Sequence, residues 1–446
     1  MDLKIIQNKL SKDISGVTIS IFRIVLGGIL LLQSSYWIIT GFIQKNIIEP
    51  TFLFPFINEL NPLNDLLMNY GLNALLLFSS ALIITNKYSR IGLVLYFFSF
   101  TYLWLLCQGY FNNHYYLISI LCFLLIFNKV PFSKFEKIRV PYLNLLILKY
   151  FIVVIYFIAG LNKINPYWLV DLQPMTYILS KIGINEHSII IPFFSYTGLL
   201  FDLLIGPLLL INKTRIIAIA VSIIFHMSNF IIFILIGGEI GFFPFIMIAT
   251  LILFISPEKI EEHYFKKNAR IASRQKYNSK VAVFLIFFII SHILLPFRHY
   301  LFDGYVDYNG IGQRFSWRLK NMYKEPKTTG LIEFVVLSSK KDTVSTFNLY
   351  NVDKAKVILT NRQKTNLIYY PNMIPQFAMK IEKHFQKMIK KSNFNFVIKG
   401  ECLIGFMGRE PQLLFDKNID LTNVDKSSYK TNTWLNKLER KPWDIK

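Results

Sequence analysis

The sequence has few cysteines and comparatively few acidic residues. Its three cysteines, Cys107, Cys122 and Cys402, are widely spaced, so we predict neither a disulfide framework nor a cysteine-based metal site, and we expect no metal. There are 27 Asp and Glu against 49 Lys and Arg, for a net charge of +22. No nucleic-acid recognition motif accompanies these basic residues, which are divided among short loops and one terminal region, so we exclude a nucleic-acid partner. No cleavable signal peptide is predicted, because the first apolar run is long enough to cross a membrane.

What the sequence has in abundance is apolar residues. They make up 53% of the 446 residues, 41 of them Phe, and several runs reach the roughly 18 residues that a membrane-spanning helix needs. We therefore predict an α-helical polytopic membrane protein whose lipid partner is the bilayer. About nine transmembrane helices are expected, at residues 17–43, 65–85, 90–107, 114–128, 143–161, 192–211, 215–236, 239–256 and 279–297.

The distribution of basic residues predicts the orientation. With the N-terminus in the cytoplasm, the inside segments hold 18 Lys and Arg, including Lys129, Lys134, Lys266 and Lys267. The outside loops hold only Lys45, Lys163 and Lys181. Because basic residues concentrate in cytoplasmic loops, we predict a multi-pass protein of the cell (inner) membrane. An odd number of spans then places the C-terminal region outside the cytoplasm.

The composition changes after residue 297. We divide the chain into a transmembrane helical domain, 1–297, and an extracytoplasmic α+β domain, 298–446. Segments 331–339, 344–350 and 395–406 are rich in β-branched and aromatic residues and are predicted strands. Segment 375–391 has apolar residues at helical spacing and a basic outer face.

Within the membrane domain, the stretch YFIAGLNKINPYWLVDL, residues 156–172, combines several signals. An apolar helix delivers Asn162 and Lys163 to its end, and Pro166 then interrupts it. Tyr167 and Trp168 follow, and such rings favour the membrane–water boundary. A partly solvated lysine there approaches neutrality and can act as a base. The alternative is a lysine that extends its amine to the membrane surface.

Other polar residues fall on or inside predicted spans. Asn113 and His114 open the fourth span at its outer end, the end that Lys163 shares, and a helix-cap role is the alternative for Asn113. His226 and Asn229 lie deeper, three residues apart on one helix face. Asp202 lies inside the sixth span. Ionisable groups at membrane depth usually face the bundle interior or an aqueous cavity; helix-packing hydrogen bonds are the alternative for His226 and Asp202.

Five segments in this order resemble a known family. They are FNNHYYL, YFIAGLNKINPYW, FHMSNF, RHYLFDGYVDYNGIGQRFSWRLK and EPQLLFDKNIDL. Together they resemble the vitamin K-dependent γ-glutamyl carboxylases, and more narrowly the bacterial homologues that share their horizontally transferred transmembrane (HTTM) domain. The resemblance runs from the first span to about residue 425, nearly the whole chain.

The resemblance implies an enzyme with two coupled reactions. A reduced vitamin K or menaquinone-type hydroquinone is epoxidised with O₂, and CO₂ is added to the γ-carbon of a peptidyl glutamate. It further implies that Lys163 is the base that deprotonates the hydroquinone. His114 would stabilise an intermediate, with Asn113 beside it. The implied partners are the membrane quinone and a peptidyl-glutamate substrate.

The chain also departs from the family pattern. Asn162 stands where the animal enzymes have a second lysine, and Tyr308 and Gln313 replace a tryptophan and a histidine. Arg314, Trp317 and Arg318 are retained, and we expect them where the outer domain meets the membrane site. With Asn162, Trp168, Asp202, His226 and Asn229 they complete the expected substrate and quinone site.

Two other functions stay open. One is a quinol-dependent oxygenase or redox protein that does not carboxylate. The other is a non-enzymatic membrane protein such as a transporter or sensor, for which inverted repeats would be typical. Lys163 and His114 favour an enzyme, because a carrier has no need of a neutral lysine at this boundary.

Overall fold

The structure is a computed structural model, and it describes residues 3–128, 136–238, 240–264, 270–319, 321–338, 340–389, 395–427 and 429–439. Lys129, Lys134, Lys266 and Lys267, which contributed to the predicted orientation, lie outside the described residues, as do Lys390 and Lys391 at the end of the predicted helix 375–391.

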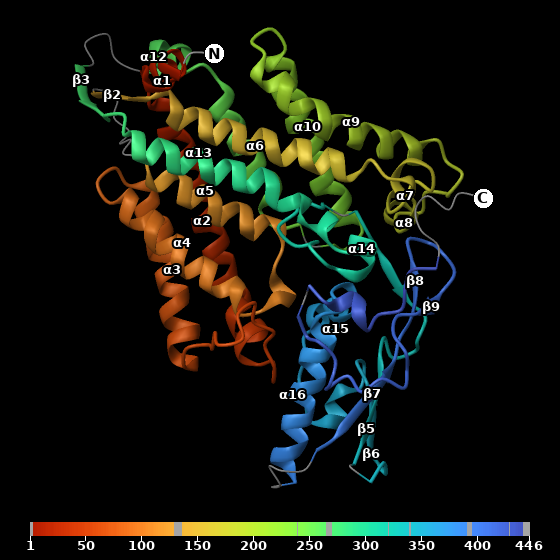
Figure 1. Ribbon diagram of the computed structural model, residues 1–446. Helices are drawn as coiled ribbons and strands as arrows, with labels where there is room; N and C mark the ends of the chain where they lie inside the picture. The colour runs from red at the N-terminus through yellow and green to blue at the C-terminus, as the bar shows by residue number, and fades with distance from the viewer. Residues whose placement is uncertain are drawn as a thin grey trace.

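The first two thirds of the chain fold into packed helices (Figure 1). Apolar side chains line most of their contacts, and the elements follow one another in this order: α1 (Leu3–Ser11), α2 (Val17–Thr40), η1 (Gln44–Ile48), η2 (Leu67–Leu72), α3 (Asn73–Ile84), α4 (Ser89–Leu105), η3 (Gln108–Tyr110), α5 (Asn113–Ile126), α6 (Tyr142–Asn162), α7 (Pro166–Leu169), α8 (Met175–Ser180), α9 (Ile190–Leu210), α10 (Arg215–Leu235), α11 (Phe243–Thr250), η4 (Leu251–Phe254), α12 (Pro257–Tyr264), α13 (Ser279–Leu294) and η5 (Leu295–Leu301).

Every predicted span coincides with a helix, but not all nine are full-length. Among the described residues, six helices are long and apolar enough to cross a membrane: Val17–Thr40, Leu67–Ile84, Tyr142–Asn162, Ile190–Leu210, Arg215–Leu235 and Ser279–Leu301. The multi-pass helical fold is therefore confirmed. By length and composition, six described helices are candidates for complete spans, or seven if the bent pair Phe243–Phe254 and Pro257–His263 counts as one, against the nine predicted.

The three remaining segments differ for physical reasons. The eighth predicted span, 239–256, begins only at Phe243, and the chain bends by 87° before Pro257–His263. The helices α4 and α5 have 17 and 14 residues. At 1.5 Å per residue they measure about 26 and 21 Å, less than the roughly 30 Å of a bilayer core. These two apolar runs therefore mark real helices that are shorter than a typical membrane span.

A small sheet gathers three segments at one end of the bundle. It has the order β1 (Asp13–Ser15), β2 (Glu136–Pro141) and β3 (Arg270–Arg274). Beside it, Glu261 of α12 forms ion pairs with Lys137 at 3.1 Å and Arg139 at 3.0 Å. Figure 1 shows α1, α12, β2 and β3 together near the N-terminus, at the opposite end from the strand-rich region. Segments that the charge pattern assigned to one face therefore lie side by side.

The C-terminal region mixes short helices with two antiparallel sheets. One sheet has the order β4 (Lys324–Pro326), β8 (Leu403–Phe406), β9 (Gln412–Leu413), and the other β6 (Thr343–Asn348), β5 (Glu333–Leu337), β7 (Val397–Glu401). The accompanying helices are α14 (Val306–Asn309), η6 (Val352–Ala355), α15 (Asn361–Tyr369), α16 (Met373–Met388) and η7 (Thr431–Thr433). Phe377 of α16 packs against Phe334 of β5, with ring centroids 5.2 Å apart.

One of the predicted strands, at residues 395–406, is two separate strands in the structure. Residues 395–406 were expected to form a single strand, but β7 and β8 belong to different sheets and separate at Cys402. The carbonyl of Cys402 accepts a hydrogen bond from the Leu414 amide at 2.8 Å. The continuous β-branched and apolar pattern gave no sign of this change of sheet, because both halves are buried on at least one side.

The two regions are joined by polar contacts at the ends of α4 and α5. The Tyr110 hydroxyl donates to Oγ1 of Thr360 at 2.6 Å, and Asn366 donates to the Gly109 carbonyl at 2.7 Å. On the other side, Arg409 forms an ion pair with Asp171 at 2.6 Å. The C-terminal region thus rests on the loops that contain the predicted site residues.

Candidate functional site

Lys163 lies at the centre of the candidate site. It follows the last residue of α6, and its amine forms an ion pair with Oδ2 of Asp202 on α9. The amine is also 3.5 Å from the Gly198 carbonyl. Lys163 and Asp202 are only 6% and 4% exposed. The lysine is therefore more deeply buried than the sequence suggested, and its partner is the carboxylate that was expected to lie at another depth.

Two glycines bring α6 and α9 close enough for this pair to form. A Cβ on Gly160 would lie 2.8 Å from the Leu203 side chain, and a Cβ on Gly206 would lie 2.8 Å from Val153. Small residues allow helix backbones in a membrane to approach closely. Asp202 is the thirteenth residue of α9, so at 1.5 Å per residue α9 begins about 18 Å before it and ends about 12 Å after it. Lys163 ends its own helix beside the middle of α9.

The short helix α7 forms a wall of the site. Asn165 caps it by accepting a hydrogen bond from the Trp168 amide at 3.1 Å, with Pro166 in the first turn. The Trp168 ring lies beneath the Lys163 amine, 4.9 Å from it, and its Nε1 donates to the Ser195 carbonyl at 3.0 Å. Tyr167 and Trp168 are buried. These rings therefore pack inside the protein, where α7 lies against α9, and their place at the membrane boundary stays a prediction.

A hydrogen-bonded pair of rings lies two helical turns before the lysine. The Tyr156 hydroxyl and Nε2 of His226 are 2.7 Å apart, and both residues are buried. Phe201, next to Asp202, packs edge-on against Tyr156 with a centroid separation of 5.6 Å. His226 therefore contacts the same cluster as the ion pair. The half-buried Asn229 forms no hydrogen bond that the structure records among the residues it describes, so it is not joined to this cluster.

Phe243 connects the two histidines. Its ring stacks on His114, with centroids 4.0 Å apart and planes 11° from parallel, and it meets His226 edge-on at 6.0 Å. Phe243 is the first residue of α11. A continuous set of contacts thus runs from Lys163 through Asp202, Phe201 and Tyr156 to His226, Phe243 and His114.

The asparagines beside the lysine and the histidine both bond to one outer segment. Nδ2 of Asn162 donates to the Ser316 carbonyl at 2.8 Å, and Nδ2 of Asn113 donates to the Arg318 carbonyl at 3.4 Å. Oδ1 of Asn113 is buried and has no hydrogen-bond partner among the described residues. Asn112, not Asn113, caps α5, accepting from the Tyr115 amide at 2.9 Å. The helix-cap alternative for Asn113 is therefore wrong by one residue.

Arg314, Trp317 and Arg318 lie at the junction of the two regions. Arg314 is hydrogen-bonded to Gln108, through the carbonyl at 3.2 Å and through the side chain, and its guanidinium lies 4.1 Å from the Tyr370 ring centroid. Trp317 stacks on Tyr116 at 5.3 Å. These side chains therefore already bond to, or pack against, other groups of the protein. None of them contacts Lys163 or His114 in a recorded interaction between described residues.

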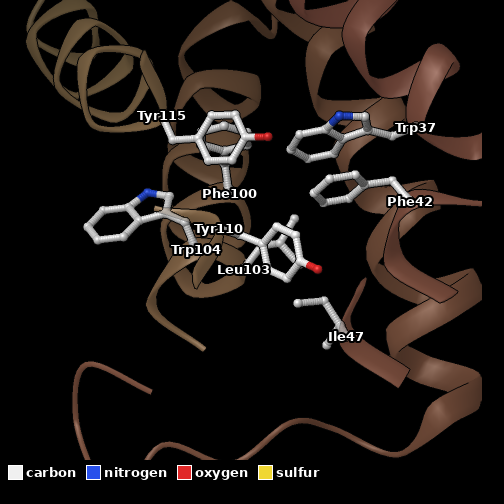
Figure 2. A pocket seen from close by; sticks show the side chains of 8 residues that line it. All are labelled: Trp37, Phe42, Ile47, Phe100, Leu103, Trp104, Tyr110 and Tyr115. Atoms are coloured by element: carbon white, nitrogen blue, oxygen red, sulfur yellow. The ribbon is translucent and has the colours of Figure 1, made fainter. Parts of the chain in front are cut away.

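Aromatic rings pack behind the first turn of α5 (Figure 2). Trp37 stacks on Phe42 at 4.3 Å and on Phe100 at 5.7 Å, and Tyr115 meets both Trp37 and Phe100 edge-on. The rings leave no space between them that would admit a water molecule. This cluster fixes the residue that follows His114 and keeps water from that side.

Sequence reasoning missed two members of the site, Tyr156 and Phe243. Tyr156 precedes Lys163 by seven residues, two turns of helix, so its position on the same helical face could have indicated that it belongs to the site. Nothing in the sequence singles out Phe243, because a phenylalanine in an apolar run is ordinary. Among the described residues, no group of three or more His, Cys, Asp and Glu side chains could hold a metal ion.

Two family models match the chain. A model described as HTTM domain matches residues 11–258, more than half of the chain. A second, described as vitamin K-dependent gamma-carboxylase, lumenal domain, matches residues 277–441. No solved structure matches the chain. The two matches follow each other in the order that the five sequence segments predicted, so the resemblance stated from them is confirmed.

Proposed function

The chain belongs to the vitamin K-dependent gamma-carboxylase family, and from this premise we propose that it is a membrane enzyme coupling hydroquinone epoxidation to glutamate carboxylation. Its hydroquinone would be reduced vitamin K or a menaquinone-type molecule, with O₂ and CO₂ as co-substrates. The acceptor would be the γ-carbon of a peptidyl glutamate. The observation that supports this most directly is the buried pair of Lys163 and Asp202 beside the hydrogen-bonded Tyr156 and His226.

The buried pair has the composition that a base needs. Ion pairs lose much of their advantage when they are withdrawn from water, because both charges lose hydration. When the shared proton lies on Oδ2 of Asp202, the Lys163 amine is neutral and can accept a proton from a hydroxyl group. Asp202 would thus hold the proton that the amine gives up, and the apolar surroundings would keep water from competing.

The remaining polar groups fit a hydroquinone. The unpartnered Oδ1 of Asn113 can accept a hydrogen bond from a ring hydroxyl, and a buried acceptor without a partner costs free energy until one is supplied. His114, stacked on Phe243, offers an imidazole on the same side. When bound, the hydroquinone supplies with O₂ the strong base that removes the γ-proton of glutamate, after which CO₂ adds to the carbanion. The chain's residues bind, orient and exclude water.

The experiment uses the full chain in lipid vesicles with hydroquinone, O₂, labelled CO₂ and glutamate-containing peptides. We expect Lys163→Ala to abolish both epoxide and labelled peptide. Lys149→Ala is the matched control, because Lys149 is also buried on α6 but lies about 20 Å away along the helix; it should retain the reaction. Equal epoxide from Lys163→Ala and wild type would remove Lys163 from the mechanism. Epoxide without labelled peptide would favour a quinol oxygenase that does not carboxylate.

We also propose that the N-terminus is cytoplasmic and that the C-terminal region lies outside the cytoplasm. The support is the small β1–β2–β3 sheet, which gathers basic segments at the end opposite the C-terminal region. Protease added to cells whose outer layers have been removed (spheroplasts) should cleave residues 298–446 and spare the N-terminal segment. The reverse pattern would overturn this orientation.

A further inference from the structure

The segment Gly310–Arg318, which we call the outer loop, contacts both halves of the proposed site through its backbone. The Ser316 carbonyl accepts from Asn162, and the Arg318 carbonyl accepts from Asn113. Asn162 directly precedes Lys163, and Asn113 directly precedes His114. These two parts of the chain lie on α6 and α5, about fifty residues apart in sequence. The outer loop therefore bridges two motifs that would otherwise be independent.

The backbone of the outer loop is strained. Phe315 has φ of 61° and Trp317 has φ of 54°, and such values are outliers for bulky side chains. Conformations of this kind persist only where the surroundings determine them, and they concentrate at functional sites. Here the surroundings are aromatic. The Phe315 ring lies 4.7 Å from Phe111 and 4.9 Å from Tyr116, and Trp317 stacks on Tyr116.

Two arginines anchor the loop, one at its end and one at its middle. Arg318 forms an ion pair with Asp307 of α14 at 2.6 Å, and the Asp307 side chain is completely buried. Arg298, at the end of the last apolar helix, donates to the Arg314 carbonyl and to Oγ of Ser316 at 3.2 Å. The ion pair that holds Arg318 also holds its backbone carbonyl, which accepts the hydrogen bond from Asn113. A substitution at Asp307 should therefore displace groups on α5 and α6 although Asp307 lies on neither helix.

We propose that the outer loop is a positioning element for the membrane site, and that Asp307 and Arg318 are positioning residues. It holds Asn162 and Asn113 so that the Lys163 amine and the His114 ring keep their relative placement. This inference rests on the proposed function, since it assigns the loop to the residues that carry that chemistry. Displacing catalytic groups by about 1 Å can lower a rate by roughly 10²-fold, so a loop remote from the substrate can control turnover.

A double-mutant cycle tests the proposal. If Asn162 acts through the loop, Asn162→Ala and Asp307→Asn should each lower kcat for epoxide by about 10-fold, and together they should also lower it by about 10-fold instead of 100-fold. KM for hydroquinone should change less than kcat. Glu261→Gln is the matched control, because Glu261 is another buried carboxylate paired to cations, at the opposite end of the bundle. Glu261→Gln should change kcat only slightly, and its effect should be independent of that of Asn162→Ala, so that the two fold-changes multiply in the double variant.

A conservative variant separates positioning from loss of folding. The Arg318 contact to Asp307 uses one guanidinium nitrogen, so Arg318→Lys should keep kcat within about threefold whereas Arg318→Gln loses about 10-fold. Multiplicative losses at Asn162 and Asp307, or an Arg318→Lys variant as slow as Arg318→Gln, would overturn the proposal.

Hydrogen–deuterium exchange of the full chain in lipid nanodiscs gives a readout that does not need the reaction. Asp307→Asn should raise exchange at least threefold in peptides covering 108–116 and 162–170, and leave 17–40 unchanged. If wild type forms no epoxide, the proposed function fails, and the exchange result still decides the positioning role. Unchanged exchange in both peptides would overturn that role even in an active enzyme.

Discussion

Replacing Asp202 by leucine should destabilise the protein strongly, for a reason that the structure makes specific. The Lys163 and Asp202 side chains are 7% and 5% exposed, so Asp202→Leu leaves a buried ammonium without its carboxylate. The Gly198 carbonyl at 3.5 Å is too distant to compensate. Removing one partner of a buried ion pair costs about 3–5 kcal/mol. We expect the free energy of unfolding to fall by about 4 kcal/mol.

The double variant Lys163→Met/Asp202→Leu should recover most of that loss. Apolar replacement of a whole buried pair is often neutral or stabilising, so we expect its free energy of unfolding to lie within about 1 kcal/mol of wild type. Epoxidation should be absent from the single and the double variant alike. The double variant would then be stable but inactive, which separates the effect of an unpaired charge on stability from the role of Lys163 in the reaction.

The assay is reversible unfolding of the full chain in mixed micelles, followed by tryptophan fluorescence, with epoxide formation measured on the same preparations. Two results would refute the reasoning. If Asp202→Leu unfolds at the same detergent fraction as wild type, the ammonium is not paired and buried as described. If the double variant is as unstable as the single one, the loss arises from packing and not from an unpaired charge.

Two further predictions concern the helix contact and the outer region. Gly160→Ala should lower the free energy of unfolding by about 1–3 kcal/mol and also lower epoxidation, because its Cβ would lie 2.8 Å from Leu203. Gly28→Ala on α2 is the control, because a Cβ there has no neighbour within 4 Å. Equal unfolding of the two variants would contradict the close contact. Burial lowers the pKa of Lys324 from its ordinary 10.5 to about 7, so above pH 7 the unfolded state binds more protons and thermal stability should rise between pH 7 and 9. Lys324→Met should flatten that rise, and an unchanged slope would show that Lys324 does not titrate in this range.

The helices were predictable because their signal is local. Each of the nine apolar runs marks a helix, and the helix expected at 375–391 appears as Met373–Met388. What the runs did not give was where a helix begins. The run predicted at 239–256 ends near the 87° bend before Pro257, but α11 begins only at Phe243. Likewise, the pattern of 395–406 did not reveal that β7 and β8 join different sheets.

The site was only partly predictable because its key contact depends on tertiary register. Lys163 and Asp202 were both named as site residues, but nothing in the sequence states that the end of α6 lies beside the middle of α9. That register is set where Gly160 meets Leu203 and Gly206 meets Val153. The same holds for Phe243, whose place between two histidines depends on where α11 begins. The roles of Lys163, Asn113 and His114 stay predictions until activity is measured.

The Lys163–Asp202 pair is hard to explain as a packing device. The α6–α9 contact is already close at Gly160 and Gly206, and a methionine with a leucine would fill the same space without loss of hydration. Titratable groups in buried sites with a specific charge partner are candidates for function. Here the pair lies beside a tyrosine–histidine hydrogen bond and one residue from an asparagine fixed by the outer loop. A structural ion pair needs none of these neighbours, and their presence supports the proposal that the amine gains and loses a proton away from water.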